Sequence, residues 1–146
     1  MGKSRIEWCD TVYNPITGCS PISEGCAHCW AKRMAHRLKG RYGYPRDDPF
    51  KVTIHPEKFI EPMSWRKHRK VFACSMGDFC HEDVPSAVIQ VFFDRMAFFD
   101  QHTYLLLTKR PQRLADEIEE WIDYSYEQVV KGLTKSERAR LKMLSG

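Results

Sequence analysis

The sequence lacks any long hydrophobic run, and no apolar segment follows Met1. Its longest apolar stretches, at 88–93 and 105–107, are too short to cross a bilayer, and nothing near the start has the pattern of a secretory signal. Internal repeats and low-complexity tracts are missing too. We therefore expect a cytoplasmic protein that has no membrane partner.

Strong charge of either sign is also missing: 23 Lys and Arg residues stand against 19 Asp and Glu residues, giving a formal net charge of +4. Such a small excess permits binding to a polyanion but does not require it. The length of 146 residues suffices for one domain with its own core. In a reducing cytoplasm, the six cysteines are expected to act as ligands or core residues rather than as disulfides.

What the sequence does have is a dense cysteine segment, residues 8–31, which holds four of the six cysteines. Cys19, Cys26 and Cys29 fall in one loop, whose glycine and proline residues let the chain turn back on itself. Two residues separate Cys26 from Cys29, and this spacing allows two side chains to bind the same metal centre. The loop therefore predicts a metal site.

The spacing alone leaves three interpretations of this loop open. The cysteines can be buried or paired in disulfides, although nothing indicates an oxidising compartment. A structural zinc ion needs four ligands, so Cys9 or His28 would have to complete the set. An iron–sulfur cluster normally takes four cysteines as well, and a cluster held by three leaves one iron open. Three cysteines without an obvious fourth favour such a reactive cluster.

Four stretches of the sequence carry a resemblance to a known family. They are the cysteine motif Asn-Pro-x-Thr-Gly-Cys-x6-Cys-x2-Cys at 14–29, HPEKF at 55–59, SMGDFCHEDVP at 75–85 and LLLTKRPQRL at 105–114. In this order they resemble a family of phage and bacterial proteins named after phage gene products 37 and 68. That family is distantly similar to radical SAM enzymes such as spore photoproduct lyase.

The resemblance implies a [4Fe-4S] cluster on Cys19, Cys26 and Cys29 and S-adenosyl-L-methionine (SAM) as its ligand. It further implies a SAM-cleaving enzyme that acts on a nucleotide or nucleic acid in the cytoplasm of a bacterial or phage-infected cell. One alternative is a zinc-stabilised, non-enzymatic module that binds nucleic acid. Another is a truncated, non-catalytic member, because the resemblance implies further strands after the helix that begins at 111.

The order of elements predicts an α/β fold. Strands are expected at 6–13, 50–54, 71–74 and 103–108, and helices at 26–39, at 85–99, from 111 onward and from 134 onward. Because strands and helices alternate, the four strands should form a parallel sheet, which resembles the first four βα units of a partial TIM-type barrel. We expect this domain to span 1–124 and a charged helical tail to span 125–146.

Two finer expectations accompany this fold. Trp30, Met34 and Leu38 recur at four-residue steps and predict one apolar face of the first helix. The strand at 103–108 is apolar throughout and is expected to be buried on both faces. An open sheet edge would remain, to be covered by a protein partner or by a missing C-terminal half.

Residues just past the strand ends of a parallel sheet face one crevice, and this rule predicts the site. It gathers the cysteine loop and a set of polar residues: Asn14, His55, Asp78, His81, Lys109 and Arg110. Asp78 can accept hydrogen bonds from ribose or an ammonium group, or it can cap a turn. Lys109 and Arg110 can bind a carboxylate or phosphate, or they can be a solvated strand end. The two histidines fit structural roles better.

A basic run from Trp65 to Lys70 is a second candidate for binding. Trp65 can stack on a base while Arg66, Lys67, Arg69 and Lys70 follow the phosphates of a nucleic acid. The alternative is a solvated loop that precedes a strand.

Overall fold

The computed structural model describes residues 6–137, and the chain divides into two compact units, Met1–Pro111 and Gln112–Gly146. The boundary thus falls at the start of the last long helix, whereas we predicted it at 124. No helix within 6–137 is both long and apolar enough to span a membrane.

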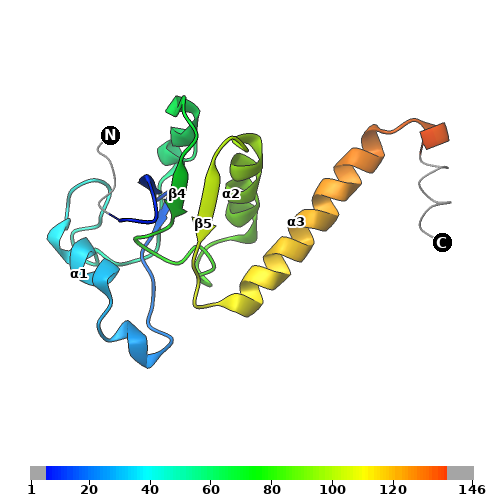
Figure 1. The fold of residues 1–146 in the computed structure, drawn as a ribbon. Helices are drawn as coiled ribbons and strands as arrows, with labels where there is room; N and C mark the ends of the chain where they lie inside the picture. Colours follow the sequence, from blue (N-terminus) through cyan, green and yellow to red (C-terminus); the bar gives the residue numbers. More distant parts are fainter. Residues whose placement is uncertain (1–5, 138–146) are drawn as a thin grey trace. The chain divides into compact units, whose positions relative to one another are not determined.

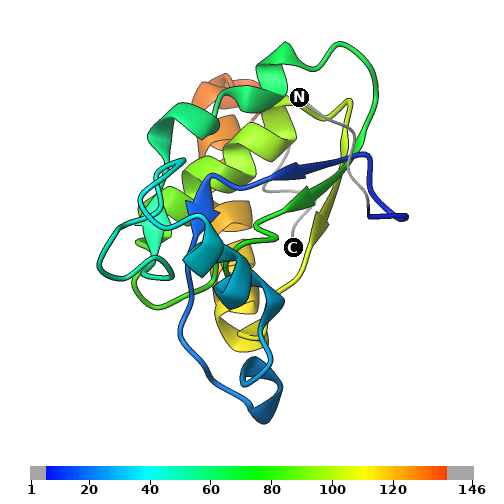
Figure 2. The same ribbon diagram turned by 90° about the vertical axis from the view of Figure 1, so that its left-hand side faces the viewer.

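Three parallel strands form the main sheet of the first unit, in the order β1 (Thr11–Tyr13), β4 (Lys70–Ala73) and β5 (Thr103–Leu106). Helix α2 (Ser86–Phe98) connects β4 to β5 and runs along the sheet (Figure 1; Figure 2). The predicted α/β fold with parallel strands is thereby confirmed. Since the strands share one direction, their carboxyl ends lie at the same edge of the sheet.

The predicted strand at 50–54 is not part of this sheet. Only β3 (Thr53–Ile54) is extended, and it pairs antiparallel with β2 (Ile16–Thr17). Pro15 separates β2 from β1, and because proline has no N–H it cannot continue a ladder as a donor. The prediction of four parallel strands was therefore wrong, and three parallel strands do not establish a partial barrel.

The core of the unit lies between the sheet and α2. Phe92 of α2 is fully buried, with its ring centroid 5.9 Å from that of Tyr13 and 5.5 Å from that of Phe79. Ile89 and Phe93 are buried on the same side of the helix. Each such side chain contributes about 1.5–3 kcal/mol of burial free energy.

Strand β5 differs from its prediction as a doubly buried strand. Thr103 is exposed, the next three residues are half-buried, and Leu107 just beyond the strand is 62 % exposed. β5 forms an edge of the three-stranded sheet, so no neighbouring strand within residues 6–137 covers its outer side.

The first helix is shorter than predicted. A 3₁₀ turn, η1 (Glu24–Cys26), precedes α1 (Trp30–Arg37), and Cys29 is the N-cap of α1, accepting a hydrogen bond from the backbone N–H of Lys32. Only Cys29 therefore stands at the amino end of the helix, whereas the helix predicted at 26–39 also included Cys26. Gly40, with φ +70°, follows the helix as expected for its carboxyl end.

The apolar face of α1 also differs from the prediction. Ala35 is fully buried, and Ala31, Met34 and Leu38 pack against the same small core. Trp30 instead is 54 % exposed. A face built on alanine allows the helix to approach its neighbours closely, and this leaves the large indole outside the contact.

The remaining connections follow the expected pattern. Two 3₁₀ turns, η2 (Pro56–Lys58) and η3 (Glu61–Ser64), occupy the interrupted connection before β4. Helix α3 (Pro111–Gly132) begins at the predicted proline. A capping box stands at the start of the helix predicted from 134 onward, because the N–H of Thr134 donates to Glu137 Oε2 (2.8 Å) and the N–H of Glu137 donates to Thr134 Oγ1 (3.4 Å).

Candidate cofactor site

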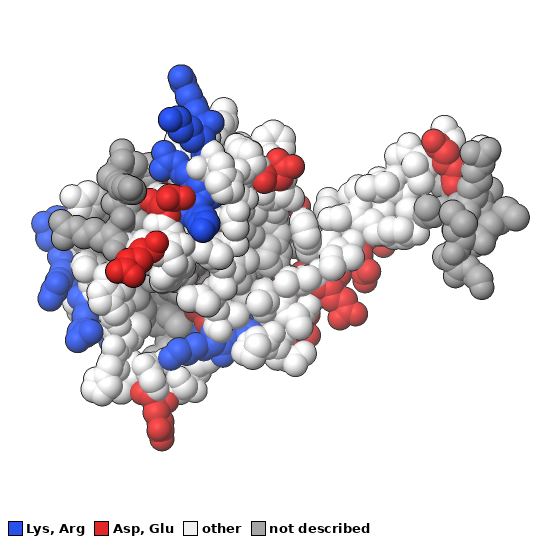
Figure 3. All heavy atoms as spheres, in the orientation of Figure 1, with Lys and Arg blue, Asp and Glu red and all other residues white. Residues whose placement is uncertain are grey.

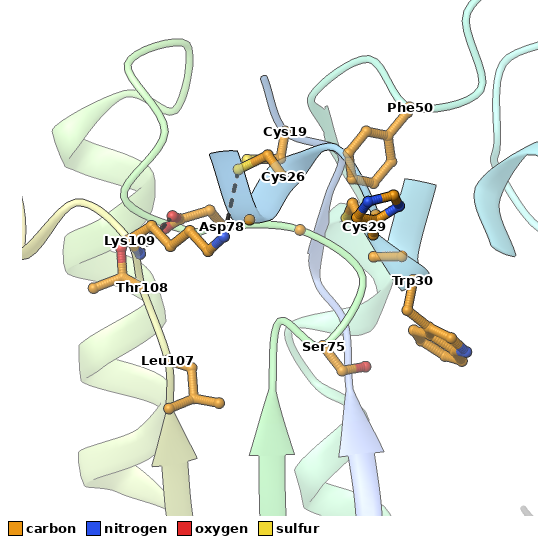
Figure 4. A pocket seen from close by; sticks show the side chains of 14 residues that line it. Cys19, Cys26, Cys29, Trp30, Phe50, Ser75, Asp78, Leu107, Thr108 and Lys109 are labelled. Atoms are coloured by element: carbon orange, nitrogen blue, oxygen red, sulfur yellow. Dashed lines mark hydrogen bonds between the residues drawn. The ribbon is translucent and has the colours of Figure 1, made fainter. Parts of the chain in front are cut away.

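A pocket of about 350 Å³ lies just beyond the carboxyl ends of the parallel strands. Figure 4 shows Cys19, Cys26 and Cys29 on one side of it and Asp78 and Lys109, which follow β4 and β5, on the other. The strand-end rule thus brought together three elements that are far apart in the sequence. Cys9, Cys74 and Cys80 are buried in the interior.

Two glycines make this arrangement possible by letting backbones touch. Gly18, which directly follows β2, and Gly77, in the turn after β4, form an isolated parallel bridge. Gly18 has φ +87°, and a Cβ there would overlap the carbonyl of Lys51. A Cβ on Gly77 would lie 2.7 Å from the carbonyl oxygen of Gly18. The close approach places Cys19 beside the loop that carries Asp78.

Each of the three thiols receives a hydrogen bond from a cationic or backbone donor. Lys109 Nζ lies 3.5 Å from Cys26 Sγ, and Arg110 Nη1 lies 3.4 Å from Cys19 Sγ. The backbone N–H of Lys32, in the first turn of α1, donates to Cys29 Sγ at 3.5 Å. Donors of this kind favour the thiolate over the neutral thiol.

The surroundings of Cys19 and Cys26 shift the pKa of these two thiols in opposite directions. The hydroxyl of Ser23, nearby backbone N–H groups and Lys109 together lower the pKa of Cys26 to about 6. Burial raises the pKa of Cys19, and the hydrogen bond from Arg110 partly opposes that effect. Cys26 is therefore the thiol most readily available as an anion.

Asp78 is buried, and both of its carboxylate oxygens are occupied. Oδ1 accepts from the hydroxyl of Thr108 (2.7 Å) and from the N–H of Cys80 (3.0 Å). Oδ2 accepts from the N–H of Lys109 (3.1 Å) and from Arg110 Nη1 (3.2 Å). Asp78 therefore holds the end of β5 against the turn after β4, and its main visible role is to position Lys109 and Arg110.

A family model described as a protein of unknown function, DUF5131, matches residues 3–143. The chain belongs to the DUF5131 family. The match includes the cysteine loop and all three strand ends. No curated protein and no solved structure matches the chain. The resemblance to the phage gene product 37 and 68 family stays a prediction.

In this DUF5131 chain, Arg110 is committed to internal contacts. Its side chain is 9 % exposed, and Nη2 donates to Ser20 Oγ (3.2 Å) while Nε lies 3.7 Å from Glu82. With its bonds to Cys19 and Asp78, it links the cysteine loop to the strand ends. A free carboxylate or phosphate, which we expected Arg110 to bind, would have to compete with these partners for the guanidinium.

Asn14 and the two histidines have supporting positions. Asn14 Oδ1 accepts from the hydroxyl of Ser75 and the N–H of Met76, both at 3.1 Å, and so fixes the loop after β4. His81 Nδ1 accepts from the N–H of Asp83, so Nε2 carries the proton and donates to Ser20 Oγ (2.7 Å).

His55 does not reach the predicted crevice. It is buried beside β3, with Nε2 2.8 Å from Thr17 Oγ1. Its strand belongs to the antiparallel pair rather than to the main sheet, so the strand-end rule does not apply to it.

Sequence reasoning missed several lining residues of the pocket. Phe50, Thr108 and Trp30 all face it, and Ser23 contacts Cys26 at 3.5 Å. Thr108 directly precedes Lys109, so the strand-end rule already pointed to it. No sequence signal placed Phe50 at the pocket. Its position depends on a tertiary contact, in which its backbone carbonyl accepts a hydrogen bond from the N–H of Cys19.

The basic run before β4 has a different structure from the one predicted. Trp65 is only 4 % exposed, its ring meets those of Tyr13 and His102 edge-on, and Arg69 lies 5.7 Å from its centroid. A buried indole cannot stack on a base, so the predicted stacking on Trp65 was wrong. Arg66, Lys67 and Lys70 are exposed at the opposite end of the sheet from the cysteine pocket.

The donors of the pocket suit a metal centre in their chemistry, although they are not gathered around one point. Among residues 6–137, no three His, Cys, Asp or Glu side chains lie close enough to hold a metal ion as placed. The three thiols nevertheless share one cavity and have donors that favour thiolates, the ligand form that zinc and iron–sulfur clusters use. A metal centre would draw these side chains inward.

Proposed function

We propose that this DUF5131 chain is a radical SAM-like iron–sulfur protein that cleaves SAM and acts on a nucleotide or nucleic acid. The proposal rests on one observation above all. Cys19, Cys26 and Cys29 share one pocket at the carboxyl edge of a parallel sheet, whereas the other three cysteines are buried in the interior. Three thiolates would hold a [4Fe-4S] cluster with one open iron.

When bound and reduced, such a cluster would offer its open iron to the amino and carboxylate groups of SAM and would supply one electron for reductive cleavage of the sulfonium. The residues of the chain would hold and orient these groups. Lys109 is exposed at the pocket and can turn from Cys26 to a SAM carboxylate. Asp78, Asn14 and Arg110 would act as positioning residues, because their polar atoms already hold the loops that form the pocket.

The test is anaerobic reconstitution with iron and sulfide, followed by iron analysis and an absorption spectrum. Cys26→Ala should lose most of the iron, whereas Cys9→Ala, which removes a buried thiol outside the pocket, should keep it. If Cys26→Ala kept its full iron content, the assignment of Cys26 as a cluster ligand would be wrong. With dithionite and SAM, the reconstituted chain should yield 5′-deoxyadenosine, and Lys109→Ala should bind SAM more weakly. A cluster that forms but neither responds to SAM nor cleaves it would indicate a non-catalytic member.

One observation supports a second candidate, a zinc-stabilised module that binds nucleic acid. His28 is exposed and lines the same pocket, so it could complete a Cys₃His set. Cys9, the other fourth ligand considered from the sequence, is buried elsewhere. The variant His28→Ala distinguishes the two candidates. A zinc module should lose its zinc, whereas an iron–sulfur protein should keep its cluster spectrum.

A further inference from the structure

The segment from Cys26 to Arg46 has an unusual charge distribution. It contains six cations, Lys32, Arg33, Arg37, Lys39, Arg41 and Arg46, and neither Asp nor Glu. In the part of the chain that the structure describes, none of these six forms an ion pair with an acidic group. Figure 3 shows Lys and Arg side chains gathered over α1. The segment is therefore a cationic surface whose charge is not neutralised from within.

One large aromatic side chain stands on this surface. Trp30 is 54 % exposed and, with Arg33, Met34 and Arg37, lines a cavity of about 200 Å³ beside α1. These positions, at steps of three and four residues, lie on one side of the helix. Trp30 also lines the cysteine pocket (Figure 4), so one indole borders both cavities.

We infer that this face of α1 binds single-stranded nucleic acid and leads it to the cysteine pocket. An exposed indole offers a stacking surface for an unpaired base, and Arg33 and Arg37, about one and two turns further along the helix, can bind neighbouring phosphates. A duplex keeps its bases stacked inside and cannot present one to Trp30 without flipping it out. An acidic peptide would meet the charge but has no planar group that requires the indole.

The position of this surface separates it from the basic run at 65–70. That run has its only tryptophan buried in the core and lies at the opposite end of the sheet. The face of α1 instead adjoins the pocket proposed to hold the cluster, so the inference deepens the proposed function by naming its substrate class. Binding itself needs no cluster, and a test on the metal-free chain therefore fails or succeeds independently of the iron chemistry.

The experiment is fluorescence anisotropy of labelled single-stranded DNA, single-stranded RNA and duplex DNA with the full-length, metal-free chain. At salt between about 50 and 200 mM, affinity should fall steeply, because phosphate contacts release counterions. Single strands should bind more tightly than the duplex. The difference between the DNA and RNA arms then identifies which of the two sources the surface prefers.

Variants separate stacking from charge. Trp30→Ala should weaken binding about 5- to 150-fold, the equivalent of the loss of one stacked base, whereas Trp30→Phe should retain most of it. The double variant Arg33→Ala/Arg37→Ala should make the salt slope shallower by about 1.4, since each phosphate contact on a single strand contributes about 0.7. The matched control, Arg66→Ala/Lys67→Ala, removes the same charge at the other end of the sheet and should leave both values unchanged.

Three outcomes would overturn the inference. The first is no binding of any single strand at low salt, and the second is an equal loss in the two double variants, which would mean attraction by net charge alone. The third is displacement of the oligonucleotide by a polyglutamate peptide whose carboxylate concentration equals the phosphate concentration of the oligonucleotide. Loss of binding in Trp30→Ala with retention in Trp30→Phe, at unchanged circular dichroism, would support it.

Discussion

The buried contact between Asp78 and Arg110 makes the sharpest prediction about stability. Both side chains are at most 9 % exposed, and Asp78 accepts from four donors, one of them the guanidinium. Asp78→Ala removes the acceptor and leaves a buried cation and the hydroxyl of Thr108 without this partner. Removing one partner of a buried ion pair costs about 3–5 kcal/mol. That is a large fraction of the about 5–15 kcal/mol that stabilises an ordinary domain.

The chain contains a matched control for this change. Glu82 lies 3.7 Å from the same guanidinium, but its side chain is 69 % exposed. Exposed ion pairs contribute at most about 1 kcal/mol, so Glu82→Ala should have a small effect on the free energy of unfolding. Urea unfolding of the metal-free chain, followed by circular dichroism, measures both. Equal losses in Asp78→Ala and Glu82→Ala would refute the reasoning, because burial would then not matter.

Two further predictions concern backbone and pH. Gly18→Ala should lower the free energy of unfolding by at least about 1–3 kcal/mol, because its φ of +87° is unfavourable for alanine and the new Cβ would overlap the carbonyl of Lys51. The control in the same urea assay is Gly132→Ala, whose added Cβ would have no atom within 4 Å. Burial lowers the pKa of His55 and His102 below the ordinary 6.5. The folded state therefore binds fewer protons than the unfolded chain, so the urea midpoint should fall as the pH drops from about 7.5 to about 5.5, and a constant midpoint would contradict this.

The sequence predicted the pocket better than it predicted the sheet. Spacing placed Cys19, Cys26 and Cys29 together, and the strand-end rule added Asp78 and Lys109; all five line one cavity. This worked because both rules depend on local chain geometry and on the direction of strands. They do not depend on how many strands pair.

The errors arose where burial depends on distant partners. Periodicity placed Trp30 in the core and the basic neighbours of Trp65 suggested a surface position, but the structure reverses both. Trp65 is buried because Tyr13 and His102, remote in sequence, enclose it. Trp30 stays outside because the contact face of α1 consists of Ala31, Met34, Ala35 and Leu38. The segment at 50–54 was assigned to the sheet for a similar reason, since strand propensity does not identify the pairing partner.

The hydrogen bonds of Arg110 have a consequence for the order in which the protein is assembled. They join the cysteine loop at Cys19 and Ser20 to Asp78 without help from any metal. Small zinc domains, in contrast, fold only when the ion arrives, because their ligands have no other support. Here protein groups alone support the cysteine loop, so we expect any metal to enter a chain that is already folded. A chelator should therefore remove metal from a chain that stays folded, and the empty protein should remain competent to be loaded again.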